Sequence, residues 1–157
     1  MQKQFGFILL ILSISSFSFP SQKDKSESQP ELKHIIQGEF ESSFGKGWQF
    51  SWNLNSTPHR IFGKSISQDF DANDPIASEY AARDFIFNHP SLFNIYEENL
   101  DLWVNEQHGN LRYLIFNQVY ENIPVWNGRI DFRYRLNGDL VLIGHDAFPN
   151  LNVNTNP

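Results

Sequence analysis

The stretch RIDFRYRLNGDLVLIG, residues 129–144, decides the fold class. Its apolar side chains occupy every second position up to Leu136 and alternate with arginine and aspartate, which is typical of a strand with one buried and one solvent-facing side. The dipeptide Asn137-Gly138 follows, and it is the strongest short-range signal for a β-hairpin. The apolar run from Leu140 to Gly144 predicts the returning strand. We therefore expect an antiparallel hairpin here.

Four more strands are predicted upstream of this hairpin. They cover residues 48–54, 60–66, 101–105 and 111–120, with turns at 55–58, 107–110 and 122–125. The first of these places four large side chains on one face: Trp48, Phe50, Trp52 and Leu54. The strand at 111–120 is apolar on both faces in its middle, as a central strand should be.

One amphipathic helix is predicted between the second and third strands. Asp74 is a suitable capping carboxylate and Pro75 suits the first helical position. Pro90 disfavours helical geometry at the preceding residue and so ends the element. The apolar stripe at helical spacing comprises Ile76, Ala77, Tyr80, Ala81 and Phe85, with Ala82 and Ile86 at its edge. These elements predict an α+β fold in which one helix packs on a curved antiparallel β-sheet.

The amino-terminal region differs in composition from the rest. Residues 1–20 combine one lysine, a short apolar run and a serine-rich end, which predicts a secretory signal peptide. The alternative is a retained membrane anchor, but a spanning helix needs about 20 apolar residues. Residues 21–45 are predicted to be a polar tether and lead-in, whose last part, 34–44, fits either a short helix or a strand. The folded domain is expected at 46–150, with a linker starting at 151–157 and a further region missing beyond it.

Composition excludes several classes. The 157-residue chain is 40% hydrophobic and 15% aromatic, unlike a disordered chain. Its formal net charge is −6 and its twelve basic residues are scattered, so we expect no nucleic-acid partner. We also expect no membrane association after signal cleavage and a secreted, periplasmic or extracellular location. The chain has no cysteine, so disulfides cannot stabilise it.

No catalytic motif is present in the sequence. Five histidines occur without a His-Glu-x-x-His pair, and no serine lies in a Gly-x-Ser-x-Gly elbow. We therefore expect no catalytic residue, metal ligand or cofactor in this chain. Paired acids of the glycosidase kind remain an alternative. Trp48, Trp52 and Trp126 could stack on sugar rings, although large aromatics in strands are more often buried in the core.

The carboxyl-terminal half resembles a known family. The run Arg112 to Tyr120 contains an Arg, a Gln-x-Tyr and an apolar centre, and Asn122-Ile123-Pro124-Val125-Trp126 then forms a turn ahead of the alternating strand and Asn137-Gly138. This order resembles the amino-terminal prosegment, or propeptide domain, of thermolysin-like and fungalysin-like secreted zinc metalloproteases. The likeness covers residues 46–149. Asn122 stands where the family usually has glycine, but asparagine tolerates positive φ better than most residues.

The resemblance implies a non-catalytic role. It implies an intramolecular chaperone and inhibitor of a metalloprotease catalytic domain, acting in cis or in trans, with cystatin-like layering of helix on sheet. Zinc would be bound only by a downstream catalytic domain. The residues of the implied protease-contact turn are Asn122, Ile123, Pro124, Val125 and Trp126, and the family-motif residues are Arg112, Gln118, Tyr120, Asn137 and Gly138. The alternatives are a free-standing exported protease inhibitor or binding module, or a small carbohydrate-binding protein or enzyme.

Overall fold

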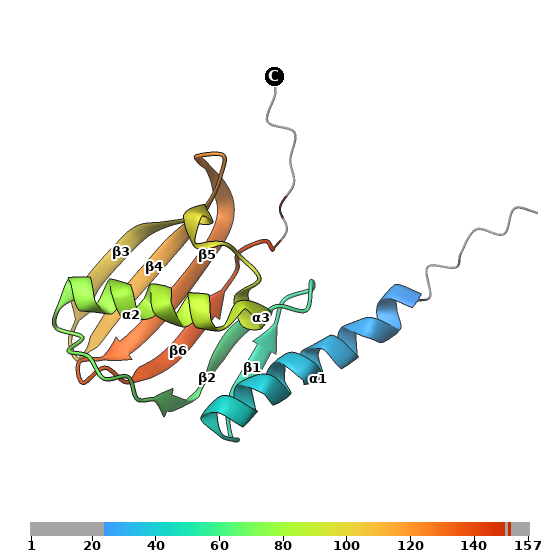
Figure 1. Cartoon of the computed structure of the whole chain (residues 1–157), viewed down its shortest axis with the longest axis horizontal. Helices are drawn as coiled ribbons and strands as arrows, with labels where there is room; N and C mark the ends of the chain where they lie inside the picture. Colours follow the sequence, from blue (N-terminus) through green and yellow to red (C-terminus); the bar gives the residue numbers. More distant parts are fainter. Residues whose placement is uncertain (1–23, 150, 152–157) are drawn as a thin grey trace, which may run out of the picture.

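Six antiparallel strands form one open sheet in the order β1-β2-β6-β5-β4-β3 (Figure 1). The structure, a computed structural model, describes residues 24–149 and 151. The strands are β1 (Gln49–Trp52), β2 (Pro58–Ile66), β3 (Leu100–His108), β4 (Leu111–Tyr120), β5 (Ile123–Arg135) and β6 (Leu140–His145). The helices are α1 (Asp24–Phe44), α2 (Pro75–Asn88), α3 (Pro90–Phe93) and a single 3₁₀ turn, η1 (Glu97–Asn99). The expectations for the signal peptide and for residues 150 and 152–157 lie outside the described residues.

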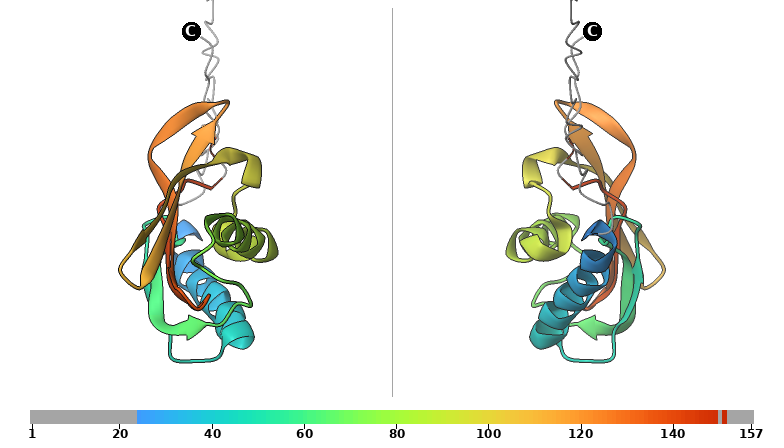
Figure 2. Two further views of the ribbon diagram at one scale, coloured as in Figure 1. Left: turned by 90° about the vertical axis from the view of Figure 1, so that its left-hand side faces the viewer. Right: turned by 90° about the vertical axis from the view of Figure 1, so that its right-hand side faces the viewer.

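The helices of the described part of the chain all lie on one side of the sheet (Figure 2). Residues paired directly across antiparallel strands share a face, so one buried row can be followed across the sheet. Phe132 of β5 packs edge-on against Phe85 of α2 with ring centroids 5.9 Å apart, which places the row on the helix side. The row consists of Leu114, Phe132, Ile143, Ile61 and Phe50. The predicted α+β class and its layering of helix on antiparallel sheet are confirmed.

Helix α1 is the main addition to the predicted architecture. Residues 24–33, which we expected to be tether, are helical, and the ambiguous stretch 34–44 continues the same helix. Ile36, Phe40 and Phe44 recur every fourth residue and so share one face. The ring of Phe40 lies edge-on to Trp48 and to Phe50, with centroid distances of 5.3 and 5.5 Å. The lead-in therefore covers the β1 edge of the core.

Helix α2 begins as predicted but is rotated from the expected orientation. The Asp74 carboxylate accepts hydrogen bonds from the backbone N–H groups of the first turn, and Pro75 occupies the first helical position. The buried residues are Ser78, Ala82, Phe85 and Ile86. Ile76 and Tyr80, expected in the core, are 80% and 74% exposed. The apolar stripe is broad enough to allow either rotation, and packing selects the face that brings Phe85 onto the sheet.

Two turns differ from the predicted geometry. Glu121 and Asn122 both have positive φ, 49° and 64°, so the β4–β5 turn is made by this pair and β5 already begins at Ile123. At the β5–β6 turn only Gly138 has positive φ, and the loop is longer than the two-residue turn that we expected. The β3 strand likewise extends to His108, through part of the predicted turn.

The prediction that Leu54 shares the buried face of β1 is wrong. The strand stops at Trp52, and Leu54 lies in the following turn with its side chain in solvent. Trp48 is buried, and Phe50 and Trp52 pack against the core. Among the described residues, no helix has the length and apolar character needed to cross a bilayer.

Candidate functional site

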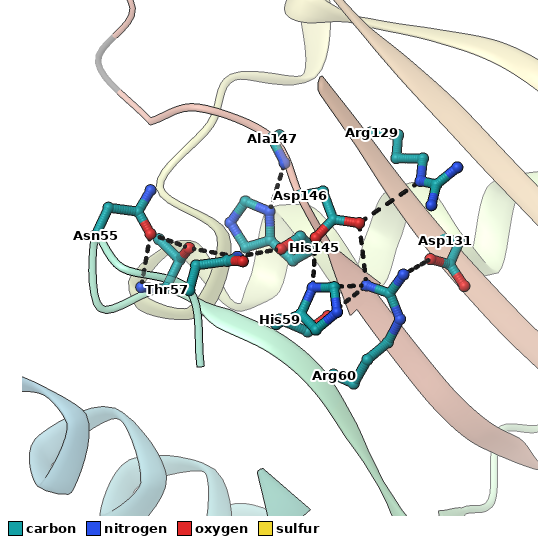
Figure 3. Close-up of polar contacts among 10 residues, drawn as sticks. Asn55, Thr57, His59, Arg60, Arg129, Asp131, His145, Asp146 and Ala147 are labelled. Atoms are coloured by element: carbon teal, nitrogen blue, oxygen red, sulfur yellow. Dashed lines mark hydrogen bonds and ion pairs between the residues drawn. The ribbon is translucent and has the colours of Figure 1, made fainter. Parts of the chain in front are cut away.

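A cluster of charged side chains surrounds the residue that follows β6. One carboxylate oxygen of Asp146 lies 2.5 Å from Nδ1 of His59. The other lies 3.2 Å from Nη1 of Arg60 and 3.6 Å from Nε of Arg129 (Figure 3). The backbone N–H of Asp146 also donates to the carbonyl of Arg129, at 2.8 Å. Asp146 thus ties the end of β6 to β2 and β5.

The environment of Asp146 favours its charged form. Partial burial raises the pKa of the Asp146 carboxyl, but the hydrogen bond with His59 and the charges of Arg60 and His59 outweigh burial. The pKa of Asp146 therefore lies below its ordinary value. The carboxylate is therefore ionised at neutral pH, where Arg60 and Arg129 are also charged.

Arg60 also reaches a second carboxylate across an intervening strand. Its Nη2 lies 3.7 Å from Oδ2 of Asp131, which is buried in β5. Gly144 of β6 pairs with Arg60 on one side and with Asp131 on the other. The side chains can meet over β6 because Gly144 has none.

His145 occupies the opposite, helix-covered side of β6. Its Nε2 lies 2.9 Å from the carbonyl oxygen of Phe93, and its Nδ1 accepts a hydrogen bond from the N–H of Ala147. These partners require a neutral ring with the proton on Nε2. Burial lowers the pKa of His145 to about 4, against smaller opposing effects of the Phe93 hydrogen bond and the Asp146 charge. The histidine is a neutral connector between α3 and the segment after β6.

The loop between β1 and β2 is attached to the same place. The Asn53 side-chain amide donates to the carbonyl of His145 at 2.7 Å. Oδ1 of Asn55 accepts from both the N–H and the hydroxyl of Thr57, which shapes the loop locally (Figure 3). An open depression of about 600 Å³ lies between this loop and the segment Asp146 to Phe148.

Gln118 secures the next residues of that segment. Its amide N–H donates to the carbonyl of Phe148 and its oxygen accepts from the N–H of Phe148, both at 2.8 Å. Gly128 leaves room for this side chain, since a Cβ there would lie 2.7 Å from the Gln118 amide oxygen. The chain leaving β6, residues 145–148, is therefore held at three successive points by His145, Asp146 and Gln118.

Arg112 holds a different segment, the loop that leads into α2. It is buried, and its guanidinium donates to the carbonyls of Ala72 and Asn73 and to the side chain of Asn105. No carboxylate pairs with it among the described residues. Its task is to join the start of α2 to β3 and β4.

The tip of the β4–β5 hairpin carries exposed apolar side chains. Trp126 is 87% exposed, and Ile123 and Pro124 are exposed as well. Trp126 and Trp103, which is 63% exposed, line one depression of about 310 Å³ together with Asn117, Asn127 and Arg129. Of the tryptophans weighed as a sugar platform, Trp48 and Trp52 pack into or against the core, and only Trp126 is in solvent.

The carboxylate of Asp146 pairs with one histidine and two arginine side chains. Among the described residues, no hydroxyl is hydrogen-bonded to His59 or Asp146, and the hydroxyl of Thr57 donates to Asn55. The described part of the chain contains no group of three or more potential metal-ligating side chains. The geometry fits a polar anchor for the end of β6.

The predicted site residues fall into four separate places. The turn residues Asn122 to Trp126 lie together at the hairpin tip, with Tyr120 paired to Ile123 at its base. Gln118 faces the segment after β6, and Arg112 faces the loop before α2. Asn137 and Gly138 form the turn at the other end of β5. The His59, Arg60 and Asp146 cluster was missed, because the sequence places His59 and Asp146 87 residues apart.

Comparison with protein-family models, with characterised proteins and with solved structures finds no match for this chain.

Proposed function

We propose that this chain acts as a prosegment-like domain of a secreted zinc metalloprotease, serving as chaperone and inhibitor without catalysis of its own. One observation carries the proposal: the exposed hairpin tip and the segment that leaves β6 lie at the same end of the sheet (Figure 1). Gln118 joins them, because it sits in β4 beside Gly128 and holds Phe148. A protease domain attached beyond this segment would start next to the hairpin.

The physical basis is linkage. A partner that binds only the native protease stabilises that state by mass action, and a covalent connection keeps its effective concentration high. If the segment that leaves β6 is held firmly, the effective concentration rises further, because the two domains sample fewer relative orientations. The three contacts on residues 145–148 supply such an exit, and Ile123, Pro124 and Trp126 supply apolar contact area.

Inhibition and assisted refolding test the proposal directly. The purified chain is added to a thermolysin-like catalytic domain, and both peptidase rate and recovery of activity after denaturation are measured. We expect inhibition at micromolar concentration and a higher refolding yield, both weakened by Trp126→Ala. Phe87→Ala is the control, because Phe87 is exposed on α2 and away from the hairpin. Unchanged rate and unchanged yield with the unmodified chain would rule out this role.

The alternative of a free-standing exported inhibitor or binding module shares this surface. The two hypotheses differ in what the gene encodes: for a free-standing inhibitor, no protease domain would follow in the same reading frame. In that case the chain would inhibit in trans but would not raise the refolding yield of a catalytic domain. The two measurements above therefore separate the alternatives.

A carbohydrate-binding role is the second candidate. It is favoured by the shared depression of Trp103 and Trp126, since exposed indole rings can stack on sugars while Asn117 and Asn127 offer amide hydrogen bonds. Glycan-array binding that Trp103→Ala and Trp126→Ala both abolish, with thermal stability unchanged, would favour this role over the first.

A further inference from the structure

A groove of about 790 Å³ lies between the outer side of α2 and the end of α1. This volume is within the range of about 300–1,000 Å³ that is typical of ligand-binding clefts. The loop from β2 to α2 closes its third side. The groove lies on α2 and α1, not at the β4–β5 hairpin, so it is separate from the surfaces used in the proposed function.

The walls of the groove are largely apolar. Ile76 and Tyr80, one helical turn apart, present exposed side chains, and the small residues Ala77 and Ala81 beside them leave α2 accessible. Phe44 and Phe85 stack at the α1 side with centroids 5.8 Å apart. An exposed apolar surface with a polar rim is a feature of interaction sites. The side chains of Ile76 and Tyr80 are not part of the hydrophobic core.

The charged side chains of the groove are all acidic. Asp69 and Asp84 line it, and their carboxylates have no hydrogen-bond or ion-pair partner among the described residues, while Asp74 caps α2. No lysine or arginine of the described residues lines the groove. Its one histidine, His89, lies 2.7 Å by Nδ1 from the carbonyl of Phe85. A positively charged partner would therefore complement this rim.

We propose that the groove binds a helical protein segment with one apolar face flanked by lysine or arginine. Ridges of side chains four residues apart accept the apolar face of a second helix, which is the usual helix-in-groove mode of recognition. The acids at the rim would pair with the flanking cations and suppress binding of acidic segments. The inference goes beyond the proposed function and does not depend on it.

Two designed peptides test the chemistry of the occupant. Both are helical peptides of about 15 residues with leucines on one face, and one carries lysine where the other carries glutamate. Binding to the full chain is measured by titration calorimetry at two salt concentrations. We expect the lysine peptide to bind at least about tenfold more tightly than the glutamate peptide, with the preference reduced at high salt.

Matched variants locate the binding. Ile76→Ala and Tyr80→Ala should each weaken the lysine peptide about tenfold, and Phe87→Ala should not, although Phe87 is exposed on the same helix to the same 74% as Tyr80. The double change Asp69→Asn with Asp84→Asn should reduce the salt dependence, whereas Glu98→Gln, an exposed acid outside the groove, should leave it unchanged.

Three results would overturn the proposal. The first is that both peptides bind equally tightly, or that neither binds at about millimolar concentration. The second is an effect of Phe87→Ala as large as that of Tyr80→Ala, which would place binding elsewhere. The third is concentration-dependent dimerisation that Tyr80→Ala abolishes, because the occupant would then be a second copy of this chain.

Discussion

A Cβ atom added to Gly144 would lie 2.0 Å from Oδ2 of Asp131. The same atom would lie 2.9 Å from Nη1 of Arg60. The ion pair between Arg60 of β2 and Asp131 of β5 passes over β6 at Gly144. This position therefore requires glycine, because any side chain would occupy the same space. A side chain at this position would push the buried carboxylate of Asp131 away from Arg60.

The variant Gly144→Ala should therefore unfold more easily. We expect a loss of about 1–3 kcal/mol in the free energy of unfolding, the usual cost of forcing extra volume into a packed site. Chemical denaturation measures it. Gly38→Ala is the matched control, since a Cβ at Gly38 in α1 meets nothing within 4 Å, and it should stabilise by about 0.5–1 kcal/mol. Equal stability of the two variants would contradict the geometry at Gly144.

The buried His145 should make stability depend on pH. Its folded-state pKa of about 4 lies below the ordinary 6.5, so the unfolded chain binds the proton more readily. Stability is therefore complete above about pH 6.5 and falls as pH is lowered toward 4, by about 3 kcal/mol in total. Denaturation curves between these pH values measure the loss.

A substitution separates His145 from other titrating groups. His145→Gln can keep the N–H donor toward the Phe93 carbonyl but does not titrate, so its stability should be flatter between pH 4 and 6.5. The contribution of Asp146 to the stability of the fold is also lost in acid. Because its pKa is lowered, that loss occurs below about pH 3.8, the ordinary pKa of the group. The same pH dependence in His145→Gln as in the unmodified chain would contradict the assignment to His145.

The hydroxyl of Tyr134 is buried without a hydrogen-bond partner among the described residues. Burial raises the pKa of this phenol, so it stays protonated. Tyr134→Phe removes the unpaired group and should raise the free energy of unfolding by up to about 1 kcal/mol. Tyr80→Phe, at an exposed position, should leave it unchanged. Destabilisation by Tyr134→Phe would mean that the hydroxyl has a partner.

Gln118 should control the segment after β6. Gln118→Ala removes both hydrogen bonds to Phe148, and we expect the exchange of the Phe148 amide with solvent to become at least about tenfold faster. Amides in the centre of β5 should exchange as before, apart from any global loss of stability. Hydrogen exchange followed by NMR resolves the two sites. An unchanged rate at Phe148 would show that the segment is held by other contacts.

The core facing of α2 and β5 can be measured with three alanine substitutions. Phe85→Ala and Phe132→Ala should each cost about 3–5 kcal/mol, because both rings are buried between helix and sheet. Phe87→Ala, also on α2 but exposed, should change stability by less than about 0.5 kcal/mol. A thermal melt of each variant gives the ranking, and similar melts for Phe85→Ala and Phe87→Ala would contradict the orientation of α2.

Local patterns predicted most of the elements because their signals are short in range. The alternation around Phe132 needs only neighbours two residues apart, and the cap at Asp74 with Pro75 needs only the first helical turn. The polar stretch at 24–33 gave no such signal, and its helix was not predicted. For 34–44 the spacing of Ile36, Phe40 and Phe44 allowed a helix, but only packing against Phe50 selects it.

The candidate site could be predicted only in part. The hairpin tip follows from Asn122 to Trp126, since exposed turn residues are contiguous in the chain. The roles of Arg112 and Gln118 could not be derived, because their partners are backbone atoms of distant loops, at Ala72 and Phe148. The pairing of His59 with Asp146 likewise depends on β2 lying next to β6.

By itself, the sequence determined the α+β class, the antiparallel hairpins and the start of α2, since periodicity and capping act between residues close in the chain. The tertiary structure alone decided the strand order, the side of α2 that is buried and the charge cluster after β6. These depend on which surfaces meet, and a broad apolar stripe such as that of α2 satisfies more than one orientation until the sheet beneath it is assembled.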